Sequence, residues 1–331
     1  MKLLKEIIYG VGIVGVKGST NIAVEHVAYD SRKVVSYTMF VALRGTQVDG
    51  HDYISQAIED GALSVVCEEF PAEINDSVTY IKVADSAQAL GVVAANFHDN
   101  PSDKLKLIGV TGTNGKTTSV TLMYDLFRML GYKVGLISTV VNKIHADKVD
   151  STHTTPNALD LNELLNRMVE KGCLYCFMEV SSHAVDQKRI AGVNFTGGVF
   201  TNISHDHLDY HKTFNDYLKS KLYLFESLLK SRGNIITDSK IPEYKNLKKI
   251  SLNNRFNLQV LSKGNNGIDI YSHKFKEDKQ IIEITHNQKN YKLQTDLIGK
   301  IQLKNLFMAM LAAKNSNLKF DKIVKVVSRV K

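Results

Sequence analysis

The stretch Val110-Thr111-Gly112-Thr113-Asn114-Gly115-Lys116-Thr117-Thr118 indicates the fold of this chain of 331 residues. It follows the apolar run Leu105–Val110, which is typical of a strand buried on both faces of a parallel sheet. It leads into an amphipathic pattern that predicts a helix over Thr118–Leu130. Further along the chain, apolar runs and helical patterns alternate repeatedly. We therefore expect a doubly wound α/β domain with this loop between its first strand and first helix.

The loop has the composition of a phosphate-binding loop. Backbone N–H groups in a glycine-bearing turn at a helix start can cradle phosphates. Lys116 would neutralise the terminal phosphates of a nucleotide, and Thr117 would place its hydroxyl on Mg²⁺. The general pattern has glycine where this chain has Val110, and Gly109 lies one residue before it. The strand and the helix on either side still favour phosphate binding.

The composition fits a folded protein with room for more than one domain. Hydrophobic residues make up 44% of the chain and charged residues 23%, so the chain can bury enough apolar surface to fold. Domains average roughly 150 residues, which predicts two of them. No apolar stretch reaches the ~18 residues that a membrane span needs, so we expect no membrane insertion.

The net charge and the cysteine content indicate which kinds of partner and which cellular compartment to expect. The formal net charge of +8 favours anionic partners without choosing among them. Lysines in the C-terminal third lack the interleaved aromatic side chains of a groove for single-stranded nucleic acid, so we expect no nucleic-acid partner. Cys67, Cys173 and Cys176 are too few for a disulfide framework and favour the reducing cytoplasm. Cys173 and Cys176 lie in an apolar run and are expected to be buried.

A polar cluster divides the chain into two parts. Short apolar runs alternate with helical patterns over residues 1–98. Asp99-Asn100-Pro101-Ser102-Asp103 then interrupts the pattern. We expect a small N-terminal α/β domain over 1–98, a linker over 99–104 and the phosphate-binding domain over 105–331.

An acidic residue ends a second predicted strand. Glu179 follows the apolar run Cys173–Met178 and precedes Val180-Ser181-Ser182-His183. In open α/β sheets, ligands collect beyond the carboxyl ends of the strands, so Glu179 is expected to face the same crevice as the phosphate loop. It could hold a metal that bridges the terminal phosphate. The alternative is that Glu179 and the serines only cap a helix.

A third signal is the cluster His205-Asp206-His207-Leu208-Asp209-Tyr210-His211, which follows the apolar strand Gly198–Phe200. Such a cluster can bind metal, orient a substrate or move protons. The cluster is similar to the His-x-His-x-Asp-His pattern of binuclear metallohydrolases, but Tyr210 separates Asp209 from His211. No comparable set of metal ligands is evident further along the sequence. A metal-dependent hydrolase therefore remains one alternative, and a solvated polar loop is another.

Several polar segments suit a small anionic ligand. Tyr29-Asp30-Ser31-Arg32 and the glycine-bearing Arg44–His51 each follow a predicted strand, although each could be ordinary turn chemistry. Thr155 is expected to cap a helix over Asn157–Lys171, with Pro156 at its first position. The start of that helix offers free N–H groups to an anion, or is simply well capped.

Together these motifs resemble the Mur ligases, the ATP-dependent amide-forming enzymes of peptidoglycan synthesis. The resemblance covers the chain from about residue 20 to its end. Its strongest parts are the phosphate loop, the Glu179 segment and the histidine cluster. The first-domain loops, with Thr154-Thr155-Pro156, are similar to the branch that adds the third amino acid, diaminopimelate or lysine, to UDP-N-acetylmuramoyl-L-alanyl-D-glutamate.

The resemblance implies a role for each matching residue. Two Mg²⁺ sites are implied, with Thr117 and Glu179 on the first and His207 on the second. Lys221 matches a lysine that family members carbamylate, which turns a cation into a metal ligand, although the sequence alone suggests an exposed helix lysine. The implied catalytic residues are Lys116, Glu179, His207 and Lys221. The implied ATP contacts are Gly112, Thr113, Asn114, Gly115, Lys116, Thr117, Thr118 and Asn305. The implied contacts to the UDP-substrate are Tyr29, Ser31, Thr46, Gln47, Val48, His153, Thr154, Thr155, Ser181, Gln187 and Arg189.

The implied reaction agrees with this inventory. ATP would phosphorylate the glutamyl carboxylate, and the amine of the incoming amino acid would attack the acyl phosphate. The protein would position the groups and neutralise charge on the transferred phosphoryl group. Three residues depart from the family pattern: Tyr37 and Lys212 stand where glycine is usual, and Gln302 stands for asparagine.

The resemblance also implies that the family's middle domain ends at about Lys331, so we expect the third domain, which recognises the amino acid, to be absent from these residues. One hypothesis is that these residues are the N-terminal and central part of a ligase that is whole in the cell, or whose third domain comes from another chain. Another is a binding module that holds ATP and the UDP-dipeptide without completing amide synthesis. In either case we expect the 331-residue chain to bind nucleotide weakly and to show little or no ligation.

Overall fold

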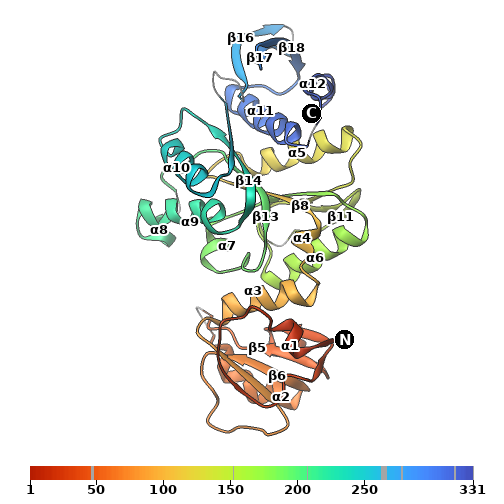
Figure 1. Cartoon of the computed structure of the whole chain (residues 1–331), viewed down its shortest axis with the longest axis vertical. Helices are drawn as coiled ribbons and strands as arrows, with labels where there is room; N and C mark the ends of the chain where they lie inside the picture. Colours follow the sequence, from red (N-terminus) through yellow and green to blue (C-terminus); the bar gives the residue numbers. More distant parts are fainter. Residues whose placement is uncertain are drawn as a thin grey trace. The chain divides into compact units, whose positions relative to one another are not determined.

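The computed structural model describes residues 1–45, 48–151, 153–206, 208–261, 267–276, 279–316 and 318–330. The chain packs into two compact units (Figure 1). Unit 1 contains residues 1–101, 156–166 and 187–193, and unit 2 contains the remaining residues. Residues 156–166 and 187–193 thus belong to the first unit. The division into consecutive stretches, which the sequence predicts, does not include them there. No described helix is long and apolar enough to span a bilayer.

Unit 1 is built on a five-stranded sheet in the order β2-β7-β6-β5-β4. Strands β4 to β7 run parallel, and β2 pairs antiparallel with β7 at one edge. The strands are β1 (Lys2–Leu3), β2 (Ile13–Lys17), β3 (Ala23–Val24), β4 (His26–Ala28), β5 (Thr38–Val41), β6 (Ala62–Cys67) and β7 (Thr79–Val83). The helices are α1 (Leu4–Ile7), η1 (Ser31–Lys33), η2 (Gly50–Tyr53), α2 (Ile54–Glu59) and α3 (Ser86–Phe97).

Unit 1 has two apolar layers, because its parallel strands bury both faces. One layer joins α1 and α3 to the sheet through side chains such as Leu4, Val41 and Val93. The other joins α2 to the opposite face and includes Phe40, Ala57 and Cys67. The nearly continuous apolar strands in the sequence follow from this double burial.

Unit 2 contains an eight-stranded sheet in the order β11-β10-β9-β12-β8-β13-β14-β15. The six strands from β9 to β15 in this order run parallel, and a hairpin of β10 and β11 extends one edge. The strands are β8 (Lys106–Thr111), β9 (Val134–Ile137), β10 (Asn142–Ile144), β11 (Asp147–Val149), β12 (Tyr175–Glu179), β13 (Phe195–Phe200), β14 (Leu229–Asp238) and β15 (Asn257–Leu261). This is the expected doubly wound α/β domain.

Helices cover the sheet of unit 2. The short helix α4 (Pro101–Lys104) precedes the first strand. The others are α5 (Lys116–Met129), α7 (Ser182–Asp186), α8 (Leu208–His211), α9 (Phe214–Ser227), α10 (Tyr244–Asn254), α11 (Lys300–Lys314) and α12 (Phe320–Val327). Helix α6 (Ala158–Glu170) is divided between the units, because residues 158–166 belong to unit 1 and residues 167–170 to unit 2. Helices α5, α11 and α12 share one large core with the sheet, to which Phe127, Phe177 and Phe307 contribute. Helix α5 lies beside α11 in Figure 1.

A small antiparallel sheet precedes α11. It consists of β16 (Asp269–Lys276), β17 (Lys279–His286) and β18 (Lys289–Thr295) in that order. Strand β17 alternates buried and partly exposed residues, as expected for a sheet with one face on a core. Ile282, Ile284 and Leu293 place that face against α11 and α12 in the common core.

The predicted start of α6 is wrong. The side chain of Asn157, rather than Thr155, caps the helix: its Oδ1 accepts a hydrogen bond from the Asp160 N–H at 3.0 Å. The hydroxyl of Thr155 is fully buried and donates to the carbonyl oxygen of Glu179 at 2.8 Å. A residue whose side chain is held by a neighbouring strand is not free to cap the helix that follows.

Two of the departures from the family pattern have a common backbone cause. Tyr37 and Lys212 both adopt left-handed conformations, with φ of 64° and 57°. Glycine adopts that conformation without steric cost, whereas other residues are strained there. The usual glycine at each position therefore reflects a turn that this chain forms with a larger residue.

Candidate active site

The phosphate loop joins β8 to α5 at the carboxyl edge of the sheet of unit 2. Gly112 has φ of +145°, and a Cβ atom there would lie 2.0 Å from Oγ1 of Thr201. Gly115 has φ of +84°, and a Cβ atom there would lie 2.9 Å from Oδ1 of Asn305. Side chains would clash at both positions, so the loop needs glycine for conformation and for close approach.

The segment after β13 supports this loop from the side. Asn202 contacts Asn114 twice: its Oδ1 accepts from the Asn114 N–H at 3.0 Å, and its Nδ2 donates to the Asn114 carbonyl oxygen at 3.0 Å. The hydroxyl of Thr201 donates to the same carbonyl at 2.7 Å. The Thr113 N–H donates to the carbonyl of Asn202 at 2.9 Å. Thr201 and Asn202 therefore hold the loop in shape.

Two lysine ammonium groups meet at one carbonyl oxygen of the loop. Nζ of Lys116 donates to the Gly112 oxygen at 3.0 Å and to the Thr113 oxygen at 2.9 Å. Nζ of Lys221 donates to the same Gly112 oxygen at 2.9 Å. Burial lowers the pKa of Lys116, although the charges of Glu179 and Asp206 oppose that shift. Burial and the charge of Lys116 lower the pKa of Lys221 to about 7, against the opposing charge of Asp206.

Lys221 is buried, with only 2% of its surface exposed, so the expectation of an exposed helix lysine is wrong. It lies on α9 at helical spacing from Tyr217 and Phe225, which are both fully buried. Its Nζ lies 4.3 Å from the centre of the Tyr217 ring. The apolar face of α9 therefore includes position 221, and this periodicity was a signal for burial that the sequence analysis did not use.

Glu179 ends β12 next to the loop and is 1% exposed. Its Oε2 accepts a hydrogen bond from Oγ1 of Thr117 at 3.0 Å and from Oγ1 of Thr139 at 3.2 Å. Its Oε1 accepts from the Thr139 N–H at 2.8 Å. A buried carboxylate beside a hydroxyl is a donor set that suits Mg²⁺. Thr139 follows β9 at the same edge of the sheet and was missed, because no motif marks it.

Rings of the histidine cluster pack against neighbouring aromatic side chains. His205 lies against Phe214, with ring centres 5.0 Å apart, whereas His211 lies 5.3 Å from Tyr217. Tyr210 donates a hydrogen bond to Asp186 at 2.7 Å. His207 lies outside the described residues. Within the described part of the chain, no three His, Cys, Asp or Glu side chains gather as a metal site.

The residues expected to hold the UDP-substrate are divided between the units. Tyr29, Ser31, Val48, Gln187 and Arg189 belong to unit 1, and His153, Thr154, Thr155 and Ser181 belong to unit 2. Thr46 and Gln47 lie outside the described residues.

Contacts within each unit position some of these side chains. In unit 1, the Arg189 Nε donates to Oε1 of Gln187 at 2.9 Å. In unit 2, Oγ1 of Thr139 contacts Oγ1 of Thr154 at 3.0 Å, which connects that threonine to Glu179. Ser181 caps α7, because its Oγ accepts from the Ala184 N–H at 3.1 Å.

A groove of about 540 Å³ begins at the first turn of α5, where Thr117 and Thr118 line it. Ile298 and Gln302 contribute the opposite lining, and Ile298 is 63% exposed. Asn305, one helical turn after Gln302, is 3% exposed and packs against Gly115. Of Ile298, Gln302 and Asn305, the sequence predicted a ligand contact only for Asn305. Ile298 and Gln302 were missed, because no phosphate-loop motif marks their segment.

Comparison with known proteins places the chain in a family. Residues 110–313 match the Mur ligase middle domain, and residues 23–98 match the Mur ligase family catalytic domain. A protein of Cytophaga hutchinsonii named UDP-N-acetylmuramoyl-L-alanyl-D-glutamate–2,6-diaminopimelate ligase is 57% identical over 68% of this chain and 46% of its own length. A protein of the same name from Clostridium perfringens is 35% identical over 99% of this chain and 67% of its own length.

The fold agrees with these relatives. A solved structure of a ligase of that name superimposes with a TM-score of 0.85 at 24% identity, over 100% of this chain and 67% of the other. The chain spans about half the length of the first curated relatives that it matches. The fold, the phosphate loop and both family matches agree, and this chain belongs to the Mur ligase family.

Proposed function

We propose that this chain provides the ATP site and the UDP-substrate site of a ligase in peptidoglycan precursor synthesis. The substrate is UDP-N-acetylmuramoyl-L-alanyl-D-glutamate, and the relatives' names support diaminopimelate rather than lysine as the added amino acid. The proposed location is the cytoplasm. The three cysteines, all buried and unpaired, are compatible with a reducing compartment.

The pairing of Thr117 with buried Glu179 beside the glycine loop is the observation that carries this proposal. It places a hydroxyl and a carboxylate next to backbone amides at a helix start, which is the arrangement needed for a nucleotide with its divalent cation. The groove beside Thr117 and Ile298 offers space with an apolar wall for the base. Asn305 lies beside Gly115 of the loop.

Thr117 and Glu179 would hold the first Mg²⁺, which supplies charge neutralisation at the phosphates when bound. The second site is proposed for His207 and the carbamate of Lys221. The low pKa of Lys221, about 7, leaves much of its amine neutral near physiological pH. That neutral nitrogen can form a bond to the carbon of CO₂ and release a proton, which gives the carbamate.

The side chains of this chain position the reacting groups for phosphoryl transfer. Lys116 now donates to two loop carbonyls and would turn to the terminal phosphate when nucleotide binds. Glycyl amides near Asn114 would hold the phosphate oxygens, so the glutamyl carboxylate can attack the terminal phosphorus in line. The bond from that phosphorus to the β–γ bridging oxygen breaks, and ADP leaves. The acyl phosphate then reacts with the amine, which forms the amide and releases phosphate.

The substrate residues keep the roles that the resemblance implies. Arg189 would pair with a carboxylate or phosphate of the UDP-dipeptide, since its guanidinium offers a planar pair of donors. Tyr29, Ser31, Thr46, Gln47 and Val48 would hold the UDP-sugar. His153, Thr154, Thr155, Ser181 and Gln187 would contact the muramoyl dipeptide.

Calorimetric titration of the 331-residue chain with the UDP-dipeptide tests the substrate site. We expect binding that Arg189→Ala weakens about tenfold, because it removes a charge-assisted contact. Arg167→Ala, which removes an exposed arginine of α6, is the matched control and should leave the affinity unchanged. Equal losses in both variants, or no binding, would contradict the assigned site.

ADP release in the presence of ATP, the UDP-dipeptide and either diaminopimelate or lysine tests the two alternatives. Robust turnover that depends on the amine would exclude a pure binding module. The metal-dependent hydrolase predicts instead that Lys116→Ala keeps a hydrolytic activity that His207→Ala abolishes. Family membership favours the ligase over that hydrolase.

A further inference from the structure

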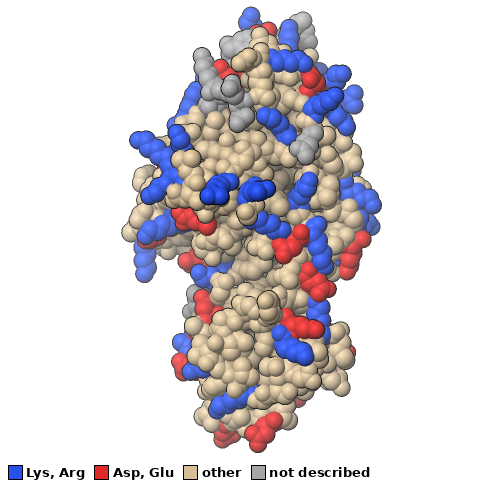
Figure 2. Space-filling model, in the orientation of Figure 1, with Lys and Arg blue, Asp and Glu red and all other residues tan. Residues whose placement is uncertain are grey.

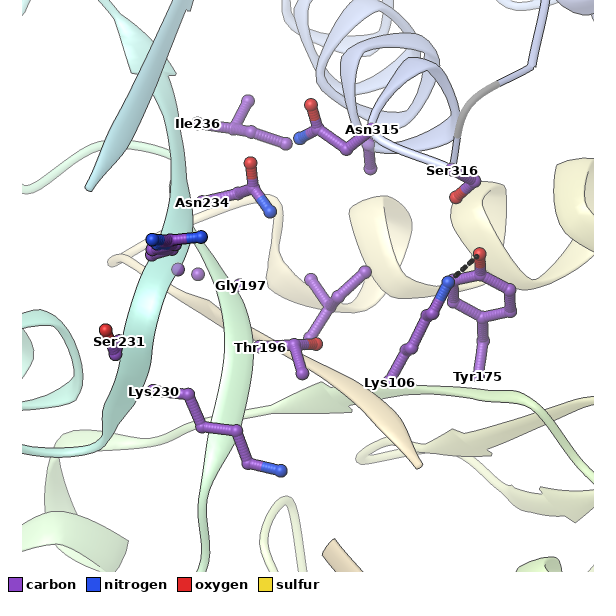
Figure 3. A pocket seen from close by; sticks show the side chains of 15 residues that line it. Lys106, Tyr175, Thr196, Gly197, Lys230, Ser231, Asn234, Ile236, Asn315 and Ser316 are labelled. Carbon is purple, nitrogen blue, oxygen red and sulfur yellow. Dashed lines mark hydrogen bonds between the residues drawn. The ribbon is translucent and has the colours of Figure 1, made fainter. Parts of the chain in front are cut away.

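A second cavity of unit 2 lies at the amino edge of the same sheet, away from the phosphate loop. It has a volume of about 250 Å³ and opens between the first residues of β8, β12 and β13 and the bulged start of β14. In Figure 3, Lys106 and Asn234 lie on opposite sides of this cavity, with Thr196 between them. Asn315 and Ser316 line it from the end of α11.

The lining carries positive charge and contains no carboxylate. Lys106, Lys230 and Arg232 are its three cations. Lys230 already pairs with Asp103 at 2.9 Å. Among the described residues, neither Lys106 nor Arg232 has a carboxylate partner, and Nζ of Lys106 contacts only the Tyr175 hydroxyl, at 3.3 Å, and its ring. Two cations of this cavity are therefore available to an anion.

Two amide side chains add neutral donors. Oδ1 of Asn234 accepts from Nδ2 of Asn257 at 2.9 Å, and Oδ1 of Asn315 accepts from Nε2 of Gln259. Both oxygens thus accept hydrogen bonds from side chains that do not line the cavity. Within the described part of the chain, no hydrogen bond engages Nδ2 of Asn234 or of Asn315. The cavity therefore presents hydrogen-bond donors, while the amide acceptors are directed to other partners.

A β-bulge near the start of β14 contains Arg232, which lines this cavity. Register between β13 and β14 shifts from Phe195↔Leu229 to Gly197↔Asn234, so residues 230–233 form a bulge. Arg232 adopts a left-handed φ of 61° within it. Such a conformation is strained for a residue with a side chain, and bulges often redirect a side chain next to a site.

We propose that this cavity binds a phosphate dianion, either free or as the monoester of a small sugar. Its two unpaired cations and two amide donors match the several oxygens and double charge of phosphate better than the two oxygens of a carboxylate. The volume of about 250 Å³ is below that of usual drug-sized sites and suits a phosphate or a small sugar phosphate better than a nucleotide or a UDP-sugar. The apolar side chains of Ile108 and Ile236 would contact the body of the sugar.

The carboxyl end of α11 opposes anion binding, because its carbonyl dipoles are negative there. That effect is a partial charge at one helix end, whereas Lys106 and Arg232 carry full charges. Positive charge is also spread over the visible face of unit 2 (Figure 2). A test must therefore separate binding in the cavity from a diffuse attraction.

The test uses inorganic phosphate and ribose 5-phosphate as probes, with ribose as the neutral control, in titration calorimetry of a Lys116→Ala chain. That background removes the main cation of the nucleotide loop. We expect binding of either phosphate probe that Lys106→Gln with Arg232→Gln weakens about tenfold or more. Tighter binding of ribose 5-phosphate would identify the monoester, and equal or weaker binding would identify free phosphate.

Lys148→Gln with Lys322→Gln is the matched control, since it removes the same charge from exposed positions of unit 2. It should leave the affinity for both probes within about twofold at constant salt. Equal losses in the two double variants would overturn the proposal in favour of diffuse attraction. Absence of binding at 10 mM probe, on the order of the weakest useful affinity, would also overturn it.

Discussion

The phosphate loop of unit 2 and the polar loop Tyr29-Asp30-Ser31-Arg32 of unit 1 are held in different ways. Contacts that connect distant parts of the sequence hold the first: Asn114 to Asn202, 88 residues apart, and Lys221 to Gly112, 109 apart. Local contacts hold the second, as Oδ1 of Asp30 accepts from the Arg32 N–H two residues on and the Arg32 guanidinium donates to the same carboxylate. A site supported by long-range contacts should respond strongly to single substitutions, and an exposed locally bonded loop weakly.

The largest effect is expected for Lys116→Ala. Nucleotide affinity should fall about 100-fold or more, because the ammonium contributes hydrogen bonds to charged phosphate worth about 1.5–3 kcal/mol each. Titration with a nonhydrolysable ATP analogue measures the change. Lys148→Ala, on the exposed β11, should have no measurable effect. Unchanged affinity of Lys116→Ala would show that the loop from Gly112 to Thr118 is not the phosphate site.

Glu179→Gln should have the next largest effect. In Mg²⁺ it should weaken nucleotide binding about tenfold, since the variant loses the anionic metal ligand and places an amide near the Thr139 N–H. In EDTA the variant and the unsubstituted chain should bind alike. Glu226→Gln on α9 is the control, as that residue is exposed. A loss of equal size in EDTA would mean that Glu179 only supports the fold.

Lys221→Met should alter stability rather than only binding. The buried ammonium has its pKa lowered from 10.5 to about 7, so the unfolded chain binds more protons between those values and stability rises with pH across that window. The slope for one group is at most about 1.4 kcal/mol per pH unit. Urea unfolding should therefore give the unsubstituted chain about 1–2 kcal/mol more stability at pH 9 than at pH 7, relative to the variant.

The same variant separates burial from carbamylation. At pH 6 to 7 Lys221→Met should be the more stable protein, because methionine fills the site without burying a charge. Labelled CO₂ should give a carbamate signal in the unsubstituted chain and none in Lys221→Met. If both proteins showed the same dependence of stability on pH, Lys221 would not carry the lowered pKa.

The sequence predicted the parts of the site that lie next to each other along the chain. Gly112 to Thr118 needed only a strand, a glycine turn and a helix start, and the structure has all three. The position of Glu179 followed from the rule that parallel strands end at one edge. The supporting contacts of Thr139 and the burial of Lys221 depend on packing between distant segments, which local patterns do not specify. Thr155 shows the same limit, because a contact with β12 overrides its capping preference.

The smallest effect is expected in unit 1, at Tyr37. Its side chain is 48% exposed and its φ is 64°, so the backbone conformation rather than packing dominates the cost. Tyr37→Gly should be about 1 kcal/mol more stable to urea than Tyr37→Ala, since alanine keeps the strain and glycine removes it. Equal stability of the two variants would mean that φ at this turn carries no cost. A difference of several kcal/mol would instead remove the contrast between this exposed turn and the phosphate loop of unit 2. A local backbone change in unit 1 would then cost as much as the loss of a long-range contact in unit 2.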